Sequence, residues 1–153
     1  MTQRAKVFLK VPKMVKNAII CDLDGTLAIN DHGRSYYDAT DCDKDSLYEP
    51  VAKVVRWAER AGYQIIFLSG REYKYADPTE RFLDKCEFDD GYVLIMRKDE
   101  DNRKDSIIKW ELYEKHIKPM NVNILFILDD RNQVVEMWRS KGFTVFQVAN
   151  GDF

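Results

Sequence analysis

The sequence predicts an α/β fold: a Rossmann-like three-layer sandwich with a central, mostly parallel sheet of five strands or slightly more. Two observations support this prediction. Short apolar runs alternate along the chain with longer segments in which apolar residues recur at helical spacing. Several of these runs are followed at once by polar, chemically active residues, at the position where parallel sheets bind ligands. A length of 153 residues suits one such domain.

The first half of the chain is expected to contain two strands and two helices in alternation. Residues 17–23 (NAIICDL) are an apolar run and the first buried strand. Residues 49–62 carry valines and alanines at helical spacing and end in glycine, which predicts a helix that stops there. Residues 64–69 (QIIFLS) are the second strand. Residues 79–88 are expected to form a helix with Thr79 as its N-cap.

The second half repeats the alternation. Residues 92–96 (YVLIM) are the third strand, and a charged loop separates them from a helix at 105–117 that is opened by Asp105 or Ser106. Residues 122–128 (VNILFIL) are the fourth strand. A helix at 132–141, ended by the following glycine, leads to a fifth strand at 143–148.

Two segments lie outside this alternation. Residues 28–49 have no clear periodicity and are expected to form a small hairpin or flap, too short for a full cap domain. Residues 1–16 are an N-terminal arm, in which 6–11 (KVFLKV) could add an edge strand; the sequence leaves both alternatives open. Residues 17–153 are taken as one domain.

The composition excludes several classes of protein. No apolar run approaches the roughly 20 residues that a membrane span needs, and lysines and a proline interrupt the basic N-terminus too often for a signal peptide. Three cysteines fit neither a zinc site nor a disulfide framework, which favours free thiols and a cytoplasmic location. A net charge of -2 makes any contact with nucleic acid local, because proteins held by many phosphate contacts are usually basic.

Three predicted strands end in residues that can carry phosphate chemistry. These are Asp22 and Asp24 after the first strand, Ser69, Gly70 and Arg71 after the second, and Asp129, Asp130 and Arg131 after the fourth. Because the carboxyl ends of parallel strands meet at one edge of the sheet, four carboxylates are expected in one crevice. They would repel one another without a hard cation, and Mg²⁺ prefers such oxygen ligands. The sequence therefore predicts a magnesium site.

Phosphoryl transfer needs a nucleophile, charge neutralisation around phosphorus and a proton for the leaving oxygen. Asp22 is the candidate nucleophile, which would form an aspartyl-phosphate, and Asp24 is the candidate general acid and base. Ser69 and the Gly70 amide could donate hydrogen bonds to the phosphoryl oxygens. A lysine and one or more arginines would balance the charge.

Two lysines compete for the catalytic position. Lys109 is favoured because it lies in the first turns of its predicted helix, four residues after Asp105, which can orient the ammonium across one turn. Lys104 lies in the preceding loop and could instead contact the substrate backbone.

Other polar residues receive no catalytic role. His32 is expected to be structural or exposed, since nothing pairs it with a nucleophile. Asp43 and Asp45 in the insert are expected to be solvated turn residues.

The order of these motifs resembles that of the haloacid dehalogenase superfamily of aspartate-nucleophile phosphatases. The motifs are Asp22-x-Asp24-Gly25-Thr26, Ser69-Gly70-Arg71, Lys109 and Asp129-Asp130. From residue 17 to 153 the chain is similar to the 3'-phosphatase domain of phage-type polynucleotide kinase/phosphatases. This closer likeness rests on DLDGTLA, GRSYYDATDCD, GYQIIFLSGRE, RKDSIIK and DDRNQVVEMW.

The resemblance implies a reaction and a set of site residues. Members of this family remove a 3'-phosphate from DNA or RNA ends so that ligation or polymerisation can follow. By the resemblance, Asp22 is the nucleophile and Asp24 the general acid and base. The implied ligands of Mg²⁺ are Asp22, the Asp24 carbonyl and Asp130. Arginines, carboxylates and a lysine complete the essential set: Arg34, Arg71, Asp105, Lys109 and Asp129.

The resemblance also bears on partners. The phage enzyme carries a kinase domain, whereas this sequence has no Gly-x-x-x-x-Gly-Lys-Ser/Thr loop. We therefore expect no 5'-kinase activity, and a separate kinase or ligase is a candidate partner on 3'-phosphorylated DNA or RNA ends. The oligomeric state stays open.

Two other functions are alternatives to this one. The same chemistry could serve free nucleotides or another small phosphoester, or the chain could be a module that binds nucleic-acid ends without catalysis. The small insert leaves the site open, and the basic and tyrosine residues around it could bind nucleic acid or be ordinary surface. The basic residues are Arg34, Arg71, Lys74, Arg97, Lys98, Arg103, Lys104 and Arg131, and the tyrosines are Tyr36, Tyr37, Tyr73 and Tyr75.

Overall fold

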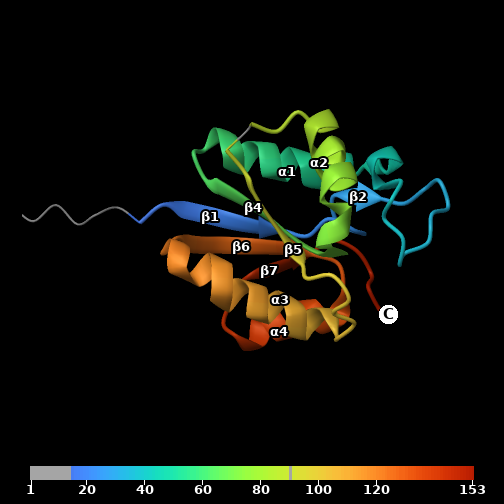
Figure 1. Cartoon of the computed structure of the whole chain (residues 1–153). Helices are drawn as coiled ribbons and strands as arrows, with labels where there is room; N and C mark the ends of the chain where they lie inside the picture. Colours follow the sequence, from blue (N-terminus) through green and yellow to red (C-terminus); the bar gives the residue numbers. More distant parts are fainter. Residues whose placement is uncertain (1–14, 90) are drawn as a thin grey trace, which may run out of the picture.

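The computed structural model describes residues 15–89 and 91–153 of the chain (Figure 1). The predicted N-terminal arm or edge strand therefore lies almost entirely outside the described residues. Its described end, Val15 and Lys16, leads directly into the first strand of the sheet.

A parallel sheet of five strands forms the centre of the molecule. Its strands are β1 (Asn17–Cys21), β4 (Gln64–Glu72), β5 (Val93–Arg97), β6 (Asn123–Asp129) and β7 (Val145–Gln147). They lie in the order β5-β4-β1-β6-β7, and each neighbouring pair is parallel, which confirms the predicted fold. The chain crosses to the other half of the sheet between β5 and β6. β1 and β6 therefore flank the crevice in which such sheets bind ligands.

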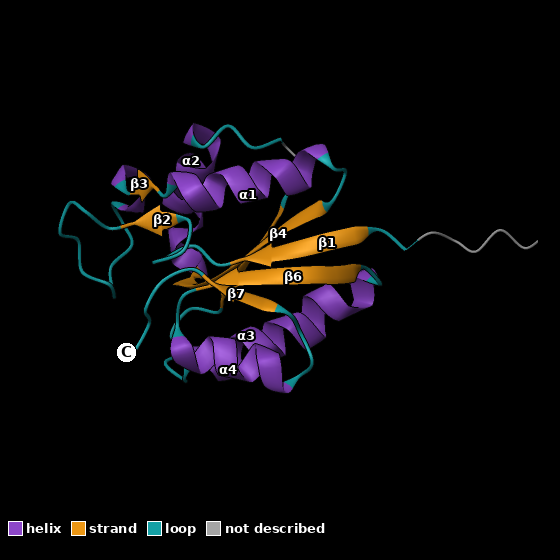
Figure 2. Ribbon diagram, turned by 180° about the vertical axis from the view of Figure 1, so that it is seen from behind, coloured by secondary structure: helices purple, strands orange, loops and turns teal. Residues whose placement is uncertain are grey.

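Helices cover both faces of this sheet and make it the middle layer of a three-layer sandwich (Figures 1 and 2). α1 (Glu49–Arg60) and α2 (Ala76–Lys85) lie on one face. α3 (Asp105–Leu112) and α4 (Asn132–Ser140) lie on the other. None of the described helices has the length and apolar character that a membrane crossing requires.

The strands bury side chains toward both helical layers. In β1, Ile19 and Cys21 join the core beneath α1 and α2, whereas Ala18 and Ile20 join the core beneath α3 and α4. Successive residues of a strand point to opposite faces, which explains why this segment is apolar throughout rather than alternating. Trp138 of α4 is fully buried in the second core.

Helix α2 differs most from its prediction. It begins at Ala76, three residues before Thr79, and ends at Lys85, three residues early. The prediction of Thr79 as N-cap is wrong, because Pro78 fits within the first turn, where its missing N–H has no helical partner to lose. Thr79 is instead fully buried. The chain leaves this region through Glu87, whose φ of 56° lies in the left-handed range.

Two other elements differ from their predictions, one in length and one in helix type. β4 runs three residues further than expected, so the Ser69-Gly70-Arg71 motif lies within the strand, where its register with β5 shifts. The helix expected at 105–117 continues past α3, but Tyr113–Ile117 is π-helical. The remaining boundaries agree with the predictions to within two residues.

The predicted small hairpin is present in the insert after β1. β2 (Ala28–Ile29) pairs antiparallel with β3 (Ser46–Leu47), and a 3₁₀ turn, η1 (Cys42–Lys44), precedes β3. η1 packs against α2, where Cys42 Sγ lies 3.6 Å from Thr79 Oγ1. Figure 2 shows the hairpin beyond the carboxyl ends of the strands. The described residues contain no larger cap domain over this edge.

Candidate active site

Most of the predicted site residues lie at or just beyond the carboxyl ends of the strands. The β2–β3 hairpin lies beyond the same ends (Figure 2). Asp22 directly follows β1, and Asp129 is the last residue of β6. The backbone turns after Asp24 through Gly25, whose φ is 78°. A Cβ at Gly25 would overlap the carboxylate of Asp130, so glycine lets this turn and the end of β6 approach closely.

Lys109 ties Asp22 to β6. Its ammonium donates hydrogen bonds of 2.7 Å to Oδ1 of Asp22 and of 2.7 Å to Oδ2 of Asp129. Burial would lower the pKa of this ammonium, but Asp129, Asp22 and Asp105 raise the pKa well above its ordinary value, so Lys109 is charged. Lys104, the other lysine considered, is exposed at the N-cap position of α3.

Asp22, Asp129 and Asp130 form a buried carboxylate cluster, with one oxygen of each within 4.8 Å of the others. The Thr26 hydroxyl lies 3.2 Å from Oδ2 of Asp22 and 3.1 Å from Oδ1 of Asp130. Burial raises the pKa of Asp22 well above its ordinary value, against the opposing effect of Lys109 and with a further increase from Asp129. One ammonium faces three carboxylates here, so the donor set fits a divalent cation.

Two of the three predicted metal ligands, Asp22 and Asp130, belong to this cluster. The Asp24 carboxylate lies outside it and accepts hydrogen bonds from Nε of Arg71 (2.8 Å), Nη2 of Arg71 (2.8 Å) and Nη2 of Arg34 (2.7 Å). Burial would raise the pKa of Asp24, but the two guanidiniums hold the pKa below its ordinary value. Asp24 is therefore ionised in this arrangement.

Asp45 belongs to the site, and its prediction as a solvated turn residue is wrong. Its side chain is fully buried and accepts hydrogen bonds from Arg34 Nε (2.9 Å), Arg34 Nη2 (2.6 Å) and Arg71 Nη2 (3.2 Å). His32 Nε2 also lies 2.9 Å from Oδ1 of Asp45. Two buried guanidiniums carry twice the charge of Asp24, so a second carboxylate balances them. No spacing in the sequence marks Asp45 as this partner.

Ser69, Gly70 and Arg71 hold the β4 side of the site. Ser69 is fully buried, and its Oγ accepts a hydrogen bond from the Arg71 N–H (3.1 Å). A Cβ at Gly70 would overlap Oδ1 of Asp105, so glycine allows α3 to approach β4. Nη1 of Arg71 donates to Oγ1 of Thr79 (3.1 Å), a contact that the early start of α2 makes available.

Asp105 lies among three cations. Its Oδ1 accepts from Nη2 of Arg97 (2.8 Å), and its Oδ2 lies 3.6 Å from both Nζ of Lys109 and Nη1 of Arg131. Burial would raise the pKa of Asp105, but Lys109, Arg97 and Arg131 hold it below its ordinary value. The predicted contact between Asp105 and Lys109 is thus present at ion-pair distance, and Arg97 is an additional partner.

Ion pairs neutralise most of the basic residues predicted around the site. Besides the contacts above, Lys74 lies 3.1 Å from Glu72. Arg103 contacts Asp101 and Glu111, each at 2.7 Å. Within the described residues, the members of this set that form no ion pair are Lys98 and Lys104.

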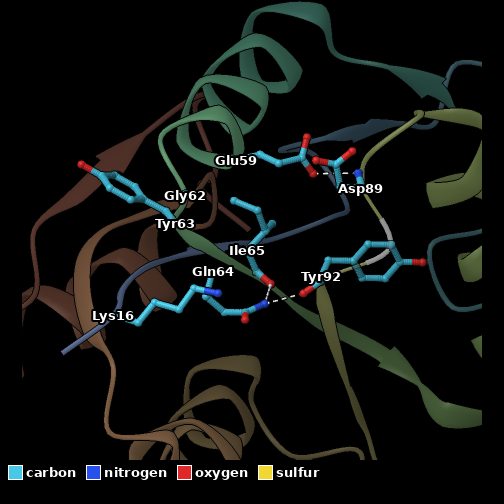
Figure 3. A pocket seen from close by; sticks show the side chains of 9 residues that line it. Lys16, Glu59, Gly62, Tyr63, Gln64, Ile65, Asp89 and Tyr92 are labelled. Atoms are coloured by element: carbon cyan, nitrogen blue, oxygen red, sulfur yellow. Dashed lines mark hydrogen bonds between the residues drawn. The ribbon is translucent and has the colours of Figure 1, made fainter. Parts of the chain in front are cut away.

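A shallow pocket lies at the opposite edge of the sheet (Figure 3). It is lined by Lys16 before β1, by Glu59 near the end of α1, and by Gln64 at the start of β4, among others. The Gln64 amide donates to the main-chain oxygens of Ile65 and Gly91. No residue of the candidate site lines this pocket, so the pocket is separate from the carboxylate cluster.

Comparison with known proteins identifies the family. The sequence model of the polynucleotide kinase PNKP phosphatase domain matches residues 16–153. The chain belongs to this family. It is therefore a phosphatase domain of the haloacid dehalogenase type, as the resemblance of its motifs predicts.

Relatives of this phosphatase domain are parts of longer proteins. A protein of Autographa californica nuclear polyhedrosis virus, named as a bifunctional polynucleotide kinase/RNA ligase, is 32% identical over 145 residues, or 93% of this chain and 21% of the viral protein. Two solved structures of a Pnkp1/Rnl/Hen1 complex, one described as an RNA repair complex, contain a similar chain. The identities are 48% and 50% and the TM-scores 0.84 and 0.85, over 91% of this chain. The chain spans 44% and 47% of those chains.

A more distant structure shares the fold alone. The class C acid phosphatase from Bacillus anthracis is 18% identical, with a TM-score of 0.61 over 93% of this chain and 70% of that one. The likeness shows that the two chains share a fold.

Proposed function

We propose that this chain is a magnesium-dependent polynucleotide 3'-phosphatase, which hydrolyses 3'-phosphate ends of DNA or RNA in nucleic-acid repair. The reaction would pass through an aspartyl-phosphate on Asp22. One observation carries the proposal: the Asp22 carboxylate is buried between the Lys109 ammonium and the carboxylates of Asp129 and Asp130. Such a cluster is costly to bury in a purely structural role and suits a phosphoryl group with a cation.

The reaction would run in two steps. A carboxylate oxygen of Asp22 attacks phosphorus and the bond to the 3'-oxygen breaks, which leaves an acyl phosphate on the enzyme. Asp24 protonates the departing oxygen and later takes a proton from the water that hydrolyses the acyl phosphate. Lys109 orients Asp22 and offsets charge on the phosphoryl group.

Mg²⁺ fits the donor set at this edge. The carboxylates of Asp22 and Asp130 and the carbonyl of Asp24 would hold it, and it would supply positive charge at the phosphoryl oxygens. The chemistry of these ligands supports this assignment, because Mg²⁺ favours a few carboxylates and completes its coordination with water and phosphate.

The other predicted residues have supporting roles in this proposal. Asp129 and Asp105 hold the Lys109 ammonium in place. Ser69, whose Oγ accepts from the backbone, keeps its own proton for a phosphoryl oxygen, and the Gly70 amide supplies a second donor.

Arg34 and Arg71 are proposed to bind the substrate phosphate. In the structure they hold Asp24 ionised, whereas Asp24 must gain a proton before it can act as an acid. Guanidiniums bind phosphate and carboxylate by the same paired geometry. An incoming phosphate would therefore compete for both arginines and release Asp24 to accept a proton.

A polynucleotide end is the substrate that these features favour. The β2–β3 hairpin is too small to enclose a metabolite, which leaves room for a polymer. The similar chain in an RNA repair complex supports the same choice, and the viral polynucleotide kinase/RNA ligase supports a kinase or ligase as partner. A cytoplasmic location stays a prediction.

Phosphate release from a 3'-phosphorylated oligonucleotide tests this proposal. Asp22→Asn should abolish release in Mg²⁺, and EDTA should abolish it for the unmodified protein. Asp41→Asn is the matched control, because it changes an exposed carboxylate of the insert that pairs with Lys44. Turnover by Asp22→Asn at the unmodified rate would refute the aspartyl-phosphate.

The choice of substrate decides between this proposal and its rivals. A clear preference for a 3'-mononucleotide over DNA and RNA oligonucleotides would favour a small-nucleotide phosphatase. Absence of release from every phosphate ester in Mg²⁺ would favour a module that binds ends without catalysis.

A further inference from the structure

We propose that Tyr36, Tyr37 and Tyr73 form a stacking surface for the unpaired bases of a single-stranded 3' end. The proposal rests on the proposed function and specifies the form of polynucleotide that the site accepts. These three side chains are 72%, 92% and 67% exposed, respectively. Aromatic rings exposed to this extent are poorly explained by packing within the domain.

Two of these tyrosines stand on the insert next to the site. The Arg34 guanidinium lies 2.7 Å from the Asp24 carboxylate, and Tyr36 and Tyr37 follow Arg34 in the chain. The N–H of Tyr37 donates to Oγ of Ser35 (3.2 Å), and this hydrogen bond stabilises a turn of the backbone from Ser35 to Tyr37. The turn leaves both rings in solvent while Arg34 reaches into the site.

The third tyrosine stands on η2 (Tyr73–Tyr75), directly after β4. Arg71 binds Asp24 from inside β4, and Tyr73 follows it by two residues. The Tyr75 hydroxyl donates to the main-chain oxygen of Tyr37 (3.4 Å), so η2 and the insert are in contact. The three exposed rings thus come from two segments that meet at the rim of the site.

Beyond the terminal phosphate, the charges around the site favour contacts to the bases of the strand over contacts to its backbone phosphates. Arg103 and Lys74 are paired with carboxylates, whereas Lys98 and Lys104 form no ion pair in the described part of the chain. Each phosphate contact of a single strand contributes a slope of about -0.7 to the dependence of log affinity on log salt. Two phosphate contacts, one from each of these lysines, would give a slope of about -1.4, and base stacking on the tyrosines would add affinity that depends little on salt.

Stacking on a side chain also selects the form of the strand. In a duplex, neighbouring bases cover both faces of each base, whereas an unpaired base offers a free face to an aromatic ring. The surface formed by the three tyrosines therefore favours a single-stranded end or a 3' overhang over a blunt end.

The test is binding and turnover of a 3'-phosphorylated single strand, its blunt duplex, and the same strand with abasic residues at its 3' end. Binding is measured with Asp22→Asn, which is expected to bind without turning over. In that background, Tyr37→Ala and Tyr73→Ala should each weaken binding of the single strand at least about fivefold. The abasic strand should bind weakly and show no further loss. Tyr37→Phe should retain binding, because the ring is kept.

Trp57→Ala is the matched control, since Trp57 is 62% exposed on α1, which ends at the opposite edge of the sheet (Figure 1). In the otherwise unmodified enzyme, the tyrosine substitutions should raise KM for the single strand at least about fivefold and change kcat less than about twofold. Equal binding of single strand and blunt duplex, or unchanged binding in both alanine variants, would overturn the proposal. Absence of turnover with intact, tyrosine-dependent binding would instead refute the proposed catalysis and leave the stacking surface supported.

Discussion

Lys109 and Asp22 lie 87 residues apart in the sequence, yet their charged groups meet at 2.7 Å in the buried centre of the site. The contact joins α3 to the end of β1, and a second hydrogen bond of 2.7 Å joins the same ammonium to Asp129 at the end of β6. One side chain thus links the two strands that flank the ligand crevice.

Lys109→Met should destabilise the protein and abolish most activity. The substitution leaves Asp22 and Asp129 buried without their cation, and loss of one partner of a buried ion pair costs about 3–5 kcal/mol. Urea unfolding measures this loss, and phosphate release should fall at least about 100-fold. Lys104→Met is the control, because that lysine is exposed and forms no ion pair within the described residues. Equal effects of the two substitutions would contradict the assignment of Lys109.

Gly70→Ala should displace α3 from β4. The added Cβ overlaps Oδ1 of Asp105, whose hydrogen bond to Arg97 must then shift. Overpacking of this kind costs about 1–3 kcal/mol, which urea unfolding detects, and turnover should fall with it. Gly91→Ala, where a Cβ meets open space, should leave both quantities near those of the unmodified protein. Full activity in Gly70→Ala would show that the close approach is dispensable.

Asp45→Asn should weaken the hold on Arg34 and Arg71 and so raise KM and lower stability. Arg34 and Arg71 lose one of the two carboxylates that balance them, and charged hydrogen bonds of this kind contribute about 1.5–3 kcal/mol each. We expect a higher KM for the phosphorylated substrate together with lower stability. Asp43→Asn alters a partly exposed carboxylate of the same insert that pairs with Arg81, and should change neither. An unchanged KM in Asp45→Asn would contradict a role of Asp45 in substrate binding through the two arginines.

The site residues differ in whether the sequence alone could predict them, and Asp45 is one that it could not. Asp22 and Asp129 could be predicted because they come directly after apolar strands, and the ends of parallel strands meet at one edge. Lys109 followed from its helical spacing to Asp105. Asp45 stands in a polar insert like Asp43, and its burial depends on how that insert folds over Arg71.

The other departures have a similar origin. The start of α2 depends on whether Pro78 lies within the first turn or precedes the helix, and the contact of Thr79 with Arg71 that accompanies the earlier start is not visible in the sequence. The basic residues around the site could be named from the sequence, but the ion pairs that neutralise them could not be predicted from it. Glu111 on α3 and Asp101 in the preceding loop both accept hydrogen bonds from Arg103, and only the folded loop brings the three side chains together.

Asp105→Asn should make stability less dependent on pH. The pKa of Asp105 is lowered in the folded protein from its ordinary value of 3.8, so between the two values the unfolded chain binds more protons. The stabilisation is present above the unfolded value and is lost as pH falls through the folded one. The variant should therefore be less stable at about pH 7, with a difference that shrinks at a pH well below 3.8. Urea unfolding at both pH values measures it, and a difference independent of pH would contradict the assignment.

Addition of Mg²⁺ should raise the unfolding temperature through the carboxylate cluster. A ligand at about 100 times its Kd stabilises the folded state by about 2.7 kcal/mol, which corresponds to about 5–10 °C for a domain of this size. Asp130→Asn removes one of the three buried carboxylates and should lose most of this shift. Asp84→Asn, on the exposed surface of α2, should keep it. Differential scanning calorimetry with and without EDTA provides the comparison. An equal shift in both variants would show that Mg²⁺ binds elsewhere. A cation held by Asp22 and Asp130 must bind more weakly when either charge is lost.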